Sequence, residues 1–436
     1  MIGTKITSSR FCFYGAISFS LKDRYNIGIM IDIKQLRSNP QKYQDSADRR
    51  GLSVEIDEAI KLDDQRLELI SKVEALRAQL NVKGKPTDEQ LAQLQQAKTE
   101  LEPLDDKLKQ TVAKIYAILQ NIPNLLAEGT PEGGEESNRE EKTWGKPEKR
   151  EVKDHLTLAE VNDWVDFERG AKVAGAKFYY LKGAAVMLEM AVVRLAMDLL
   201  VKEGFTPMTV PHLANTRTMN GTGFSPRGDE KQIYQIKDED LNLIATAEIP
   251  LTGYHADEII DQSALPLLYA GYSPSYRLEA GAYGKHSKGL YRVHQFNKLE
   301  MYVFCRAEDS AEWHDKLVDI EERICQALEI PYRLVRIAAG DLGAPAYKKY
   351  DLEYWSPVDG SYRELTSCSN VTDYQARRLN IRTRNQDGKT EFVHTLNGTA
   401  IAFSRTFIAL LENHQTVDGK VKLPAALQPY YGGEWL

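Results

Sequence analysis

The stretch "RLEAGAYGKHSKGLYRVHQFNKLE", residues 277–300, joins two strand-like segments through a glycine-rich turn. The flanking segments "LPLLYAGYSPSYRLE" (265–279) and "YRVHQFNKLEMYVF" (291–304) are rich in the aromatic and β-branched residues that favour strands. Between them, "GAYGKHSKG" (281–289) contains three glycines, two lysines and a histidine, a composition typical of a basic loop. The pattern predicts two neighbouring antiparallel strands, around which the rest of the fold can be built.

Strand alternation places particular side chains of this stretch together. Arg277 and Glu279 are two residues apart and should share one face, as should Phe296 and Glu300 on the returning strand. At about 3.3 Å per residue, Phe296 and Glu300 would lie roughly 13 Å apart, further than a single amino acid reaches. A ring, a guanidinium and carboxylates suit an amino acid lying end to end with ATP. A surface ion pair beside an ordinary core phenylalanine explains the same segment equally well.

The rest of the C-terminal part extends the same architecture. A helical pattern covers 182–204, and strand-like segments with Gly and Pro between them then continue to about residue 400. Strands without regular intervening helices favour an antiparallel sheet over a doubly wound parallel one. A last helix is expected over "TAIAFSRTFIALLEN" (399–413). The fold class is therefore α+β.

The N-terminal part has a different period. Leucine and valine recur at positions 69, 73, 76 and 80, and a similar rhythm resumes from Leu94 to Ile122 after the breaker "NVKGKPTDEQ" (81–90). This predicts two long helices that fold back on each other as an antiparallel coiled coil, with a kink or local break at Pro103. The Gly-, Pro- and charge-rich segment 122–153 has no sustained period and is typical of a surface linker.

Composition sets outer limits on the function. The 436 residues are 42% hydrophobic and 27% charged, which is typical of a globular chain with two or three domains. A net charge of −7 argues against a uniformly basic nucleic-acid coat but leaves room for a local basic stripe. Four scattered cysteines without a CxxC pair favour a reduced cytoplasmic protein without structural zinc.

The chain begins with a segment that we exclude from the fold. Residues 1–29 contain two early basic residues, several serines and the acid Asp23, which fits a transit peptide weakly. An extension upstream of a second start at Met30 is the favoured alternative. No apolar run is long enough to span a membrane, so no membrane partner is expected.

Three further segments supply polar side chains. In "LIATAEIP", Thr246 and Glu248 are two apart on what reads as an apolar strand, where a buried glutamate needs an ammonium partner. "YRELTSCSN" offers Glu364 and Ser367, hard oxygen ligands for Mg²⁺. Finally, Thr399 is expected at the start of the last helix. Arg405 lies on the apolar stripe of the same helix, from which its guanidinium either snorkels to solvent or reaches a phosphate.

Together, "ATAE", "RLEAGAYGKHSKGLYRVHQF", "YRELTSCSNVTDYQARRLNIR" and "NGTAIAFSRTFIALLEN" closely resemble motifs of the bacterial-type seryl-tRNA synthetase family, a family of class II aminoacyl-tRNA synthetases. The resemblance covers about residues 30–436. It implies a six- to eight-stranded antiparallel sheet flanked by helices. The domains it implies are an N-terminal extension (1–29), a coiled-coil tRNA-binding arm (30–125), a linker (126–153) and a class II catalytic domain (154–436).

The resemblance also implies roles for individual residues. Arg277 and Arg405 would be catalytic, with Arg277 bridging the α-phosphate and the serine carboxylate and Arg405 at the γ-phosphate. The serine site implied by the family comprises Thr246, Ala247, Glu248, Arg277, Glu300 and Thr399. The ATP site comprises Arg277, Leu278, Glu279, Val293, Phe296, Glu364, Leu365, Thr366, Ser367 and Arg405, with Glu364 and Ser367 as Mg²⁺ ligands.

Partners and acceptors follow from the same resemblance. It implies the substrates ATP and L-serine, a serine tRNA gripped by the arm, and a homodimer built on the helix near 187–204 and "TPMTVP"; selenocysteine tRNA stays open as a second acceptor. Lys285 and Lys288 are candidate contacts to the acceptor end, or members of a solvated loop. The arm is somewhat shorter than is usual, and Thr366 stands where serine is frequent. A ligase with another acceptor and a non-catalytic RNA-binding scaffold are the two rival functions.

Overall fold

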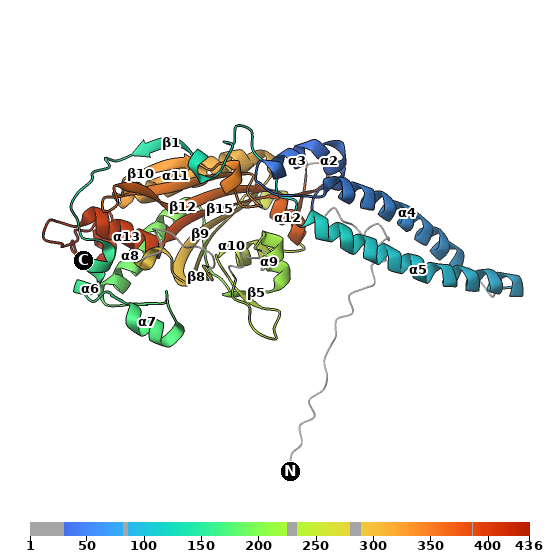
Figure 1. Cartoon of the computed structure of the whole chain (residues 1–436), viewed down its shortest axis with the longest axis horizontal. Helices are drawn as coiled ribbons and strands as arrows, with labels where there is room; N and C mark the ends of the chain where they lie inside the picture. The colour runs from blue at the N-terminus through green and yellow to red at the C-terminus, as the bar shows by residue number, and fades with distance from the viewer. Residues whose placement is uncertain (1–29, 82–85, 225–232, 280–288, 386) are drawn as a thin grey trace, which may run out of the picture. The chain divides into compact units, whose positions relative to one another are not determined.

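The computed structural model describes residues 30–81, 86–224, 233–279, 289–385 and 387–436 (Figure 1). By their internal contacts the described residues form two compact units. The first comprises residues 57–119, and the second comprises residues 30–56 together with 120–436. The loop residues Lys285, His286 and Lys288, and Cys12 near the N-terminus, lie outside the described residues.

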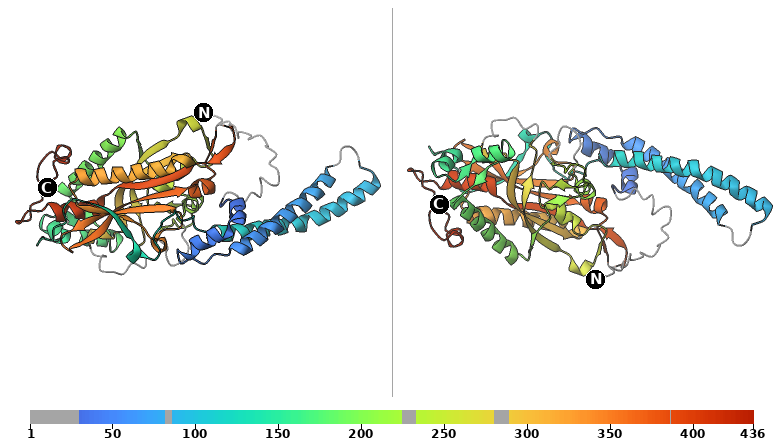
Figure 2. Two further views of the ribbon diagram at one scale, coloured as in Figure 1. Left: turned by 90° about the horizontal axis from the view of Figure 1, so that it is seen from above. Right: turned by 90° about the horizontal axis from the view of Figure 1, so that it is seen from below.

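The first unit is a pair of long helices. Helices α4 (Ile56–Leu80) and α5 (Asp88–Leu119) run antiparallel and side by side (Figure 2). The predicted seam residues Leu69, Val73 and Leu108 are buried, and Arg77 Nη2 of α4 lies 2.9 Å from Asp105 Oδ1 of α5. Of the kink or local break expected at Pro103, the break is wrong, because α5 continues through this residue as one helix. Pairing along a whole helix face compensates for the single backbone hydrogen bond that a proline removes.

An eight-stranded sheet dominates the second unit. Every neighbouring pair is antiparallel except the last, which joins β4 to β8 in parallel. The expected antiparallel sheet is therefore confirmed apart from one edge pair. In spatial order its strands are β1 (Arg139–Trp144), β10 (Tyr332–Arg336), β11 (Lys348–Ser356), β12 (Ser361–Thr372), β15 (His394–Ala402), β9 (Gln295–Cys305), β8 (Leu267–Tyr276) and β4 (Thr206–Thr209).

Three long helices pack on this sheet. They are α8 (Ala184–Lys202), α11 (Ser310–Ala327) and α13 (Phe403–His414), and their apolar faces join one core with the strands (Figure 1). Helix α11 covers one face of β12. A hydrogen bond of 2.9 Å from Thr366 Oγ1 of the strand to Glu321 Oε2 of the helix shows this contact. Neighbouring residues of a strand point to opposite faces, so Ser367 and Ser369 face away from α11. That second face carries the candidate site.

Smaller elements complete the second unit. The short α-helices are α2 (Ile33–Ser38), α3 (Pro40–Asp48), α6 (His155–Val161), α7 (Phe167–Ala174), α9 (Thr216–Thr222), α10 (Glu248–Gly253), α12 (Tyr374–Leu379) and α14 (Gln428–Tyr431). The short strands are β2 (Val165–Asp166), β3 (Tyr180–Leu181), β5 (Leu213–Ala214), β6 (Asn242–Leu243), β7 (Ile259–Ile260), β13 (Arg382–Arg384) and β14 (Thr390–Phe392). The 3₁₀ turns are η1 (Glu135–Ser137), η2 (Gln262–Ala264), η3 (Gly289–Tyr291), η4 (Ala307–Asp309) and η5 (Ala339–Asp341).

Four local expectations are corrected. "LIATAEIP" is not one strand: β6 ends at Leu243, and α10 begins at Glu248. Residues 399–402 belong to β15, so Thr399 is not at a helix start and α13 begins at Phe403. Arg277 and Glu279 follow the end of β8 rather than lying on it. Residues 139–144, within the segment expected as a linker, form the edge strand β1, whose ladder to β10 supplies the pairing that local periodicity does not reveal.

Among the described residues, no helix is both long enough and apolar enough to cross a membrane.

Candidate active site

Two adjoining cavities, each of about 220 Å³, open on the face of the sheet opposite α11. We call them together the trough, and its two halves lobe A and lobe B. Five residues line both lobes: Arg277, Lys298, Lys349, Ser367 and Thr399. Lobe A is also lined by Glu279, Tyr291, Val293, Phe296, Glu364, Ala402, Ser404 and Arg405. Lobe B is also lined by Thr222, Phe224, Thr246, Glu248, Gly343, Pro345, Ala346, Ser369, Val371 and Asn397.

Strand β9 is the central element of the trough. Its alternation puts Phe296, Lys298 and Glu300 on one face, running from lobe A toward lobe B. The register with β15 places Thr399 directly opposite Glu300. Cross-strand neighbours have Cβ atoms about 5 Å apart, so these two polar side chains are brought together by the sheet itself.

Arg277 is fixed where β8 ends. Its backbone N–H donates to the His294 carbonyl at 3.0 Å, and its own carbonyl lies 2.9 Å from His294 Nδ1. The His294 ring packs on Phe178, with the ring centroids 5.2 Å apart. The Arg277 guanidinium lies over the Phe296 ring at 5.2 Å from its centroid. A cation and an aromatic ring therefore lie together at one wall of lobe A.

Glu279 reaches lobe A by a different route from the one expected. Its backbone φ is +47°, in the left-handed region, so strand alternation does not set its direction. Arg292 Nη1 lies 3.1 Å from Glu279 Oε2, and this ion pair holds the carboxylate at the lobe. Residues in sparsely populated backbone regions are frequent at binding sites, where the surrounding structure fixes them.

Arg405 and Glu364 form an ion pair at the other wall of lobe A. Arg405 Nη1 lies 2.7 Å from Glu364 Oε1, so the guanidinium points into the cavity rather than snorkelling to solvent. Burial alone would raise the pKa of Glu364, but the charges of Arg405 and Lys349 lower it to about 2. The carboxylate is therefore ionised at every physiological pH. A second guanidinium and a permanent carboxylate suit a phosphate chain and its counter-ion.

Two buried carboxylates lie at lobe B: Glu248 lines it, and Glu300 lies behind its lining residues Thr246 and Lys298. Glu300 is 1% exposed; its Oε2 accepts a hydrogen bond of 2.9 Å from Thr246 Oγ1 and is also paired with the Lys298 ammonium. Glu248 Oε1 accepts hydrogen bonds from Gln375 Nε2 at 2.7 Å and Asn397 Nδ2 at 2.9 Å. Burial, and next the nearby charge of Glu300, raise the pKa of Glu248 to about 7. Carboxylates in this setting favour a ligand that carries an ammonium group and a hydroxyl.

The oxygen donors of lobe A fit a divalent cation bound together with phosphates. Glu364 and Ser367 both line the lobe and belong to β12. Mg²⁺ is commonly held by one or two protein oxygens, with the remaining ligands supplied by phosphates and water. Two protein ligands are therefore sufficient, although the described residues contain no group of three or more His, Cys, Asp or Glu that could bind a metal.

Most of the residues expected at the site surround the trough, but some side chains lie elsewhere. Glu300 does not line either cavity and lies behind Lys298 and Thr246. Leu365 belongs to the core, and Thr366 points to α11. Any contribution of these two residues to the site must use backbone atoms. Two more of the expected site residues lie away from the trough. Ala247 is buried in a core cluster, and Leu278 lines a separate surface hollow formed by residues 233–240.

Sequence reasoning missed several residues that line the trough or contact its lining. Lys298 had a usable signal, because it lies on β9 midway between Phe296 and Glu300 and shares their face. Lys349 had no such signal in the sequence, because it reaches the trough through the register of β11 with β12. The same holds for Gln375 and Asn397, which approach Glu248 from distant segments. Tyr291 of η3 is the fifth; its ring lies 5.1 Å from the Arg405 guanidinium.

Comparisons with known proteins identify the family. Residues 30–126 match the model of the seryl-tRNA synthetase N-terminal domain, and residues 232–414 match that of the tRNA synthetase class II core domain (G, H, P, S and T). A serine–tRNA ligase of Dictyoglomus turgidum is 49% identical over 417 residues, which cover 92% of this chain and 98% of the relative. This chain belongs to the seryl-tRNA synthetase family.

Other members of the seryl-tRNA synthetase family agree in sequence and in structure. The serine–tRNA ligase of Rubrobacter xylanophilus is 47% identical over 93% of this chain and 98% of its own length. The crystal structure of seryl-tRNA synthetase from Pyrococcus horikoshii complexed with ATP has a TM-score of 0.86 and 41% identity, and the match covers 93% of this chain and 99% of that one. The fold is therefore that of a class II synthetase.

Proposed function

We propose that this chain activates L-serine with ATP to give seryl-adenylate and transfers the seryl group to serine tRNA. The observation that carries the proposal is the continuity of the trough: lobe A has a ring and two guanidiniums, lobe B has the carboxylate of Glu248, and Arg277 and Thr399 line both. An aminoacyl-adenylate has the same order of groups, with a flat base, a phosphate and an ammonium. Serine–tRNA ligase relatives and a related synthetase complexed with ATP support the assignment.

The first step joins serine to the nucleotide. An oxygen of the serine carboxylate attacks the α-phosphorus of ATP, the bond from that phosphorus to the bridging oxygen breaks, and pyrophosphate leaves. Arg277 is placed to hold the carboxylate and the α-phosphate in line, and Arg405 to neutralise the departing phosphates. Alignment and charge stabilisation are the main terms in such displacements, so no protein nucleophile is needed.

The second step moves the seryl group to tRNA. A terminal ribose hydroxyl attacks the carbonyl carbon of the mixed anhydride, and AMP leaves. In this proposal, the helical pair α4–α5 is a coiled-coil arm that grips the tRNA, and Lys285 and Lys288 contact its acceptor end. A charging assay with selenocysteine tRNA as the acceptor tests whether that tRNA is also a substrate.

Magnesium has a defined place in the proposal. Glu364 and Ser367 would hold Mg²⁺ at the phosphates of ATP, where it neutralises charge on the leaving pyrophosphate. The ion pair between Glu364 and Arg405 keeps that carboxylate ionised and ready to bind the cation.

We further propose a cytoplasmic homodimer. Helix α8 leaves Met187 and Met190 more than half exposed, at 55% and 61%. Large apolar side chains exposed on one helix are typical of a surface that a partner covers. The helix also overlaps the segment near 187–204 that the family resemblance assigns to dimerisation.

Two assays separate this proposal from its rivals. We expect serine-dependent exchange of pyrophosphate into ATP, followed by transfer of labelled serine to total tRNA. Exchange without tRNA charging would favour a ligase with another acceptor. Silence in both assays would favour a non-catalytic RNA-binding scaffold and would overturn the proposal.

The carboxyl of Glu248 predicts a pH dependence. Its pKa is raised to about 7, so it is protonated in the free enzyme at pH 6 and ionised at pH 8. Only the ionised form attracts the serine ammonium, and kcat/KM for serine should therefore fall about tenfold per pH unit below pH 7. The measurement is the pH profile of kcat/KM in the exchange assay. Glu248→Gln should have a low, flat profile in this range, and a wild-type profile in that variant would exclude Glu248 as the titrating group.

A further inference from the structure

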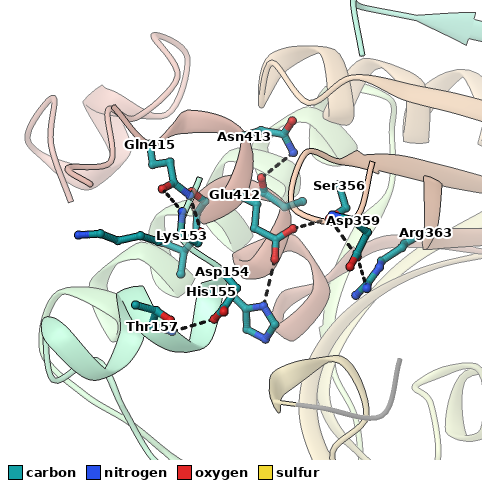
Figure 3. A network of polar contacts seen from close by, with 12 residues as sticks. Lys153, Asp154, His155, Thr157, Ser356, Asp359, Arg363, Glu412, Asn413 and Gln415 are labelled. Atoms are coloured by element: carbon teal, nitrogen blue, oxygen red, sulfur yellow. Dashed lines mark hydrogen bonds and ion pairs between the residues drawn. The ribbon is translucent and has the colours of Figure 1, made fainter. Parts of the chain in front are cut away.

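A buried polar network lies outside the trough and centres on Glu412 of α13. Glu412 is 2% exposed. Oε1 lies 3.1 Å from His155 Nδ1, at the start of α6, and Oε2 accepts a hydrogen bond of 2.7 Å from Ser356 Oγ, at the end of β11 (Figure 3). His155 is 6% exposed and Ser356 is fully buried. Three elements distant in sequence therefore meet at one carboxylate.

The network continues toward the trough through β12. Ser356 Oγ also lies 3.2 Å from Asp359 Oδ2, and Asp359 forms an ion pair with Arg363 (Figure 3). Arg363 is the residue before Glu364, the carboxylate of lobe A. A continuous set of polar contacts thus leads from α6 to the strand that carries the ion pair of that lobe.

Tyr291 connects the network with Arg405. The Arg363 guanidinium lies 5.3 Å from the centroid of the Tyr291 ring, and the Arg405 guanidinium lies 5.1 Å from the same ring. The Tyr291 hydroxyl also donates to the Glu364 carbonyl at 3.3 Å. Cation–π packing of this kind restrains a guanidinium without using its hydrogen-bond donors, which stay available for a ligand.

His155 touches the same turn from the other side. Gly289, which begins η3, has a φ of +64°, and a Cβ at this position would lie 2.5 Å from His155 Nε2. Within the described residues, His155 Nε2 is buried without a hydrogen-bond partner. A proton on Nδ1 can be donated to the Glu412 carboxylate, and Nε2 is then the ring atom that faces Gly289. The ring is held by the carboxylate and in turn supports the turn that carries Tyr291.

We propose that His155 is a positioning residue for the phosphate end of the nucleotide. It acts through Glu412 and through Gly289, which together fix Tyr291 and Arg363 and thereby the direction of the Arg405 guanidinium. The inference rests on the function proposed above in assigning the ATP phosphates to Arg405. It adds a residue that contacts neither substrate.

The test compares two substitutions at this position in the full-length enzyme. In serine-dependent pyrophosphate exchange, His155→Ala should raise KM for ATP about tenfold and KM for serine less than about twofold, because lobe B is not part of the network. His155→Asn should stay within about threefold of the wild type in both constants, since an asparagine amide can donate to Glu412 from nearly the same position. Equal increases in both constants for His155→Ala would overturn the proposal.

A control histidine is available on α13, the helix that carries Glu412. His414 at the end of this helix is partly buried, and its Nε2 lies 2.8 Å from the Leu328 carbonyl, outside the network. His414→Ala should lower the melting temperature without changing KM for ATP, and a rise like that of His155→Ala would reduce His155 to general packing. If His155→Ala fails to fold, Ser356→Ala tests the same network of polar contacts. A selective rise in KM for ATP supports the proposal, and no rise overturns it.

Failure of the proposed function would be recognised separately. If the wild type shows no exchange, that function is wrong, and calorimetric titration with ATP then decides the positioning role. Weaker ATP binding by His155→Ala than by His414→Ala would sustain the inference. Equal dissociation constants would overturn it.

Discussion

Arg277→Ala is expected to lower kcat/KM for serine-dependent pyrophosphate exchange by about 10³-fold, the range observed when one preorganised donor to a developing charge is removed. The guanidinium lies where lobes A and B meet and packs on the Phe296 ring, so it can contact both reacting groups at once. Arg277→Lys should recover little, because an ammonium cannot reproduce the planar fork.

The control for this prediction is Arg333→Ala. Arg333 also packs over an aromatic ring, at 4.8 Å from the Tyr362 centroid, and pairs with Glu353, but it lies outside the trough. Its loss should leave the exchange rate within about twofold of the wild type. An Arg277→Ala enzyme with near-normal exchange would remove this residue from catalysis.

Glu300→Gln should lower kcat/KM for serine by about 10³-fold while changing KM for ATP less than about threefold. The substitution keeps the volume but removes the charge that faces Thr246, Lys298 and Thr399. It leaves the buried Lys298 ammonium without its carboxylate and weakens the attraction of lobe B for the ammonium of serine. Steady-state exchange kinetics with each substrate varied in turn measures both constants.

Glu321→Gln is the matched control for Glu300. Glu321 is also a buried carboxyl group near the sheet, but it belongs to α11, on the face opposite the trough, and accepts a hydrogen bond from Thr366. Burial raises the pKa of Glu321 well above its usual value, which favours the neutral form, so an amide of the same shape should be tolerated and activity should persist. Equal losses in the two variants would mean that Glu300 acts only through folding.

Selectivity gives a second measure of lobe B. A site built to bond a hydroxyl leaves its own polar groups unpaired when the hydroxyl is missing, so the wild type should favour serine over alanine by about 10⁴-fold. The ratio should shrink in Glu300→Gln. An unchanged ratio would assign discrimination to other residues, with Thr399 the nearest candidate across the sheet.

Periodicity in the sequence predicted the parts of the fold that local patterns determine. The helical pair, the helix over 184–202 and the strands on either side of residues 277–300 follow from spacing that a single segment contains. The face shared by Phe296 and Glu300 was correct for the same reason. The family resemblance supplied the roles of the individual site residues.

The predictions of local structure that were wrong concern segments whose conformation depends on contacts with residues distant in sequence. Segment 139–144 becomes a strand because β10 pairs with it, and nothing in its own composition indicates an edge strand. Residues 244–247 leave the strand pattern because α10 begins at Glu248, where Gln375 and Asn397 satisfy the buried carboxylate. Strand alternation also fails for Glu279, since its backbone turns to positive φ.

The account depends most on the trough being a single binding site for both substrates. A crystal structure with a non-hydrolysable seryl-adenylate analogue tests this directly. We predict the adenine ring against Phe296, the phosphate mimic at Arg277, and the seryl ammonium between Glu248 and Thr246. An analogue bound outside the trough, or one whose seryl group points away from lobe B, would contradict the account.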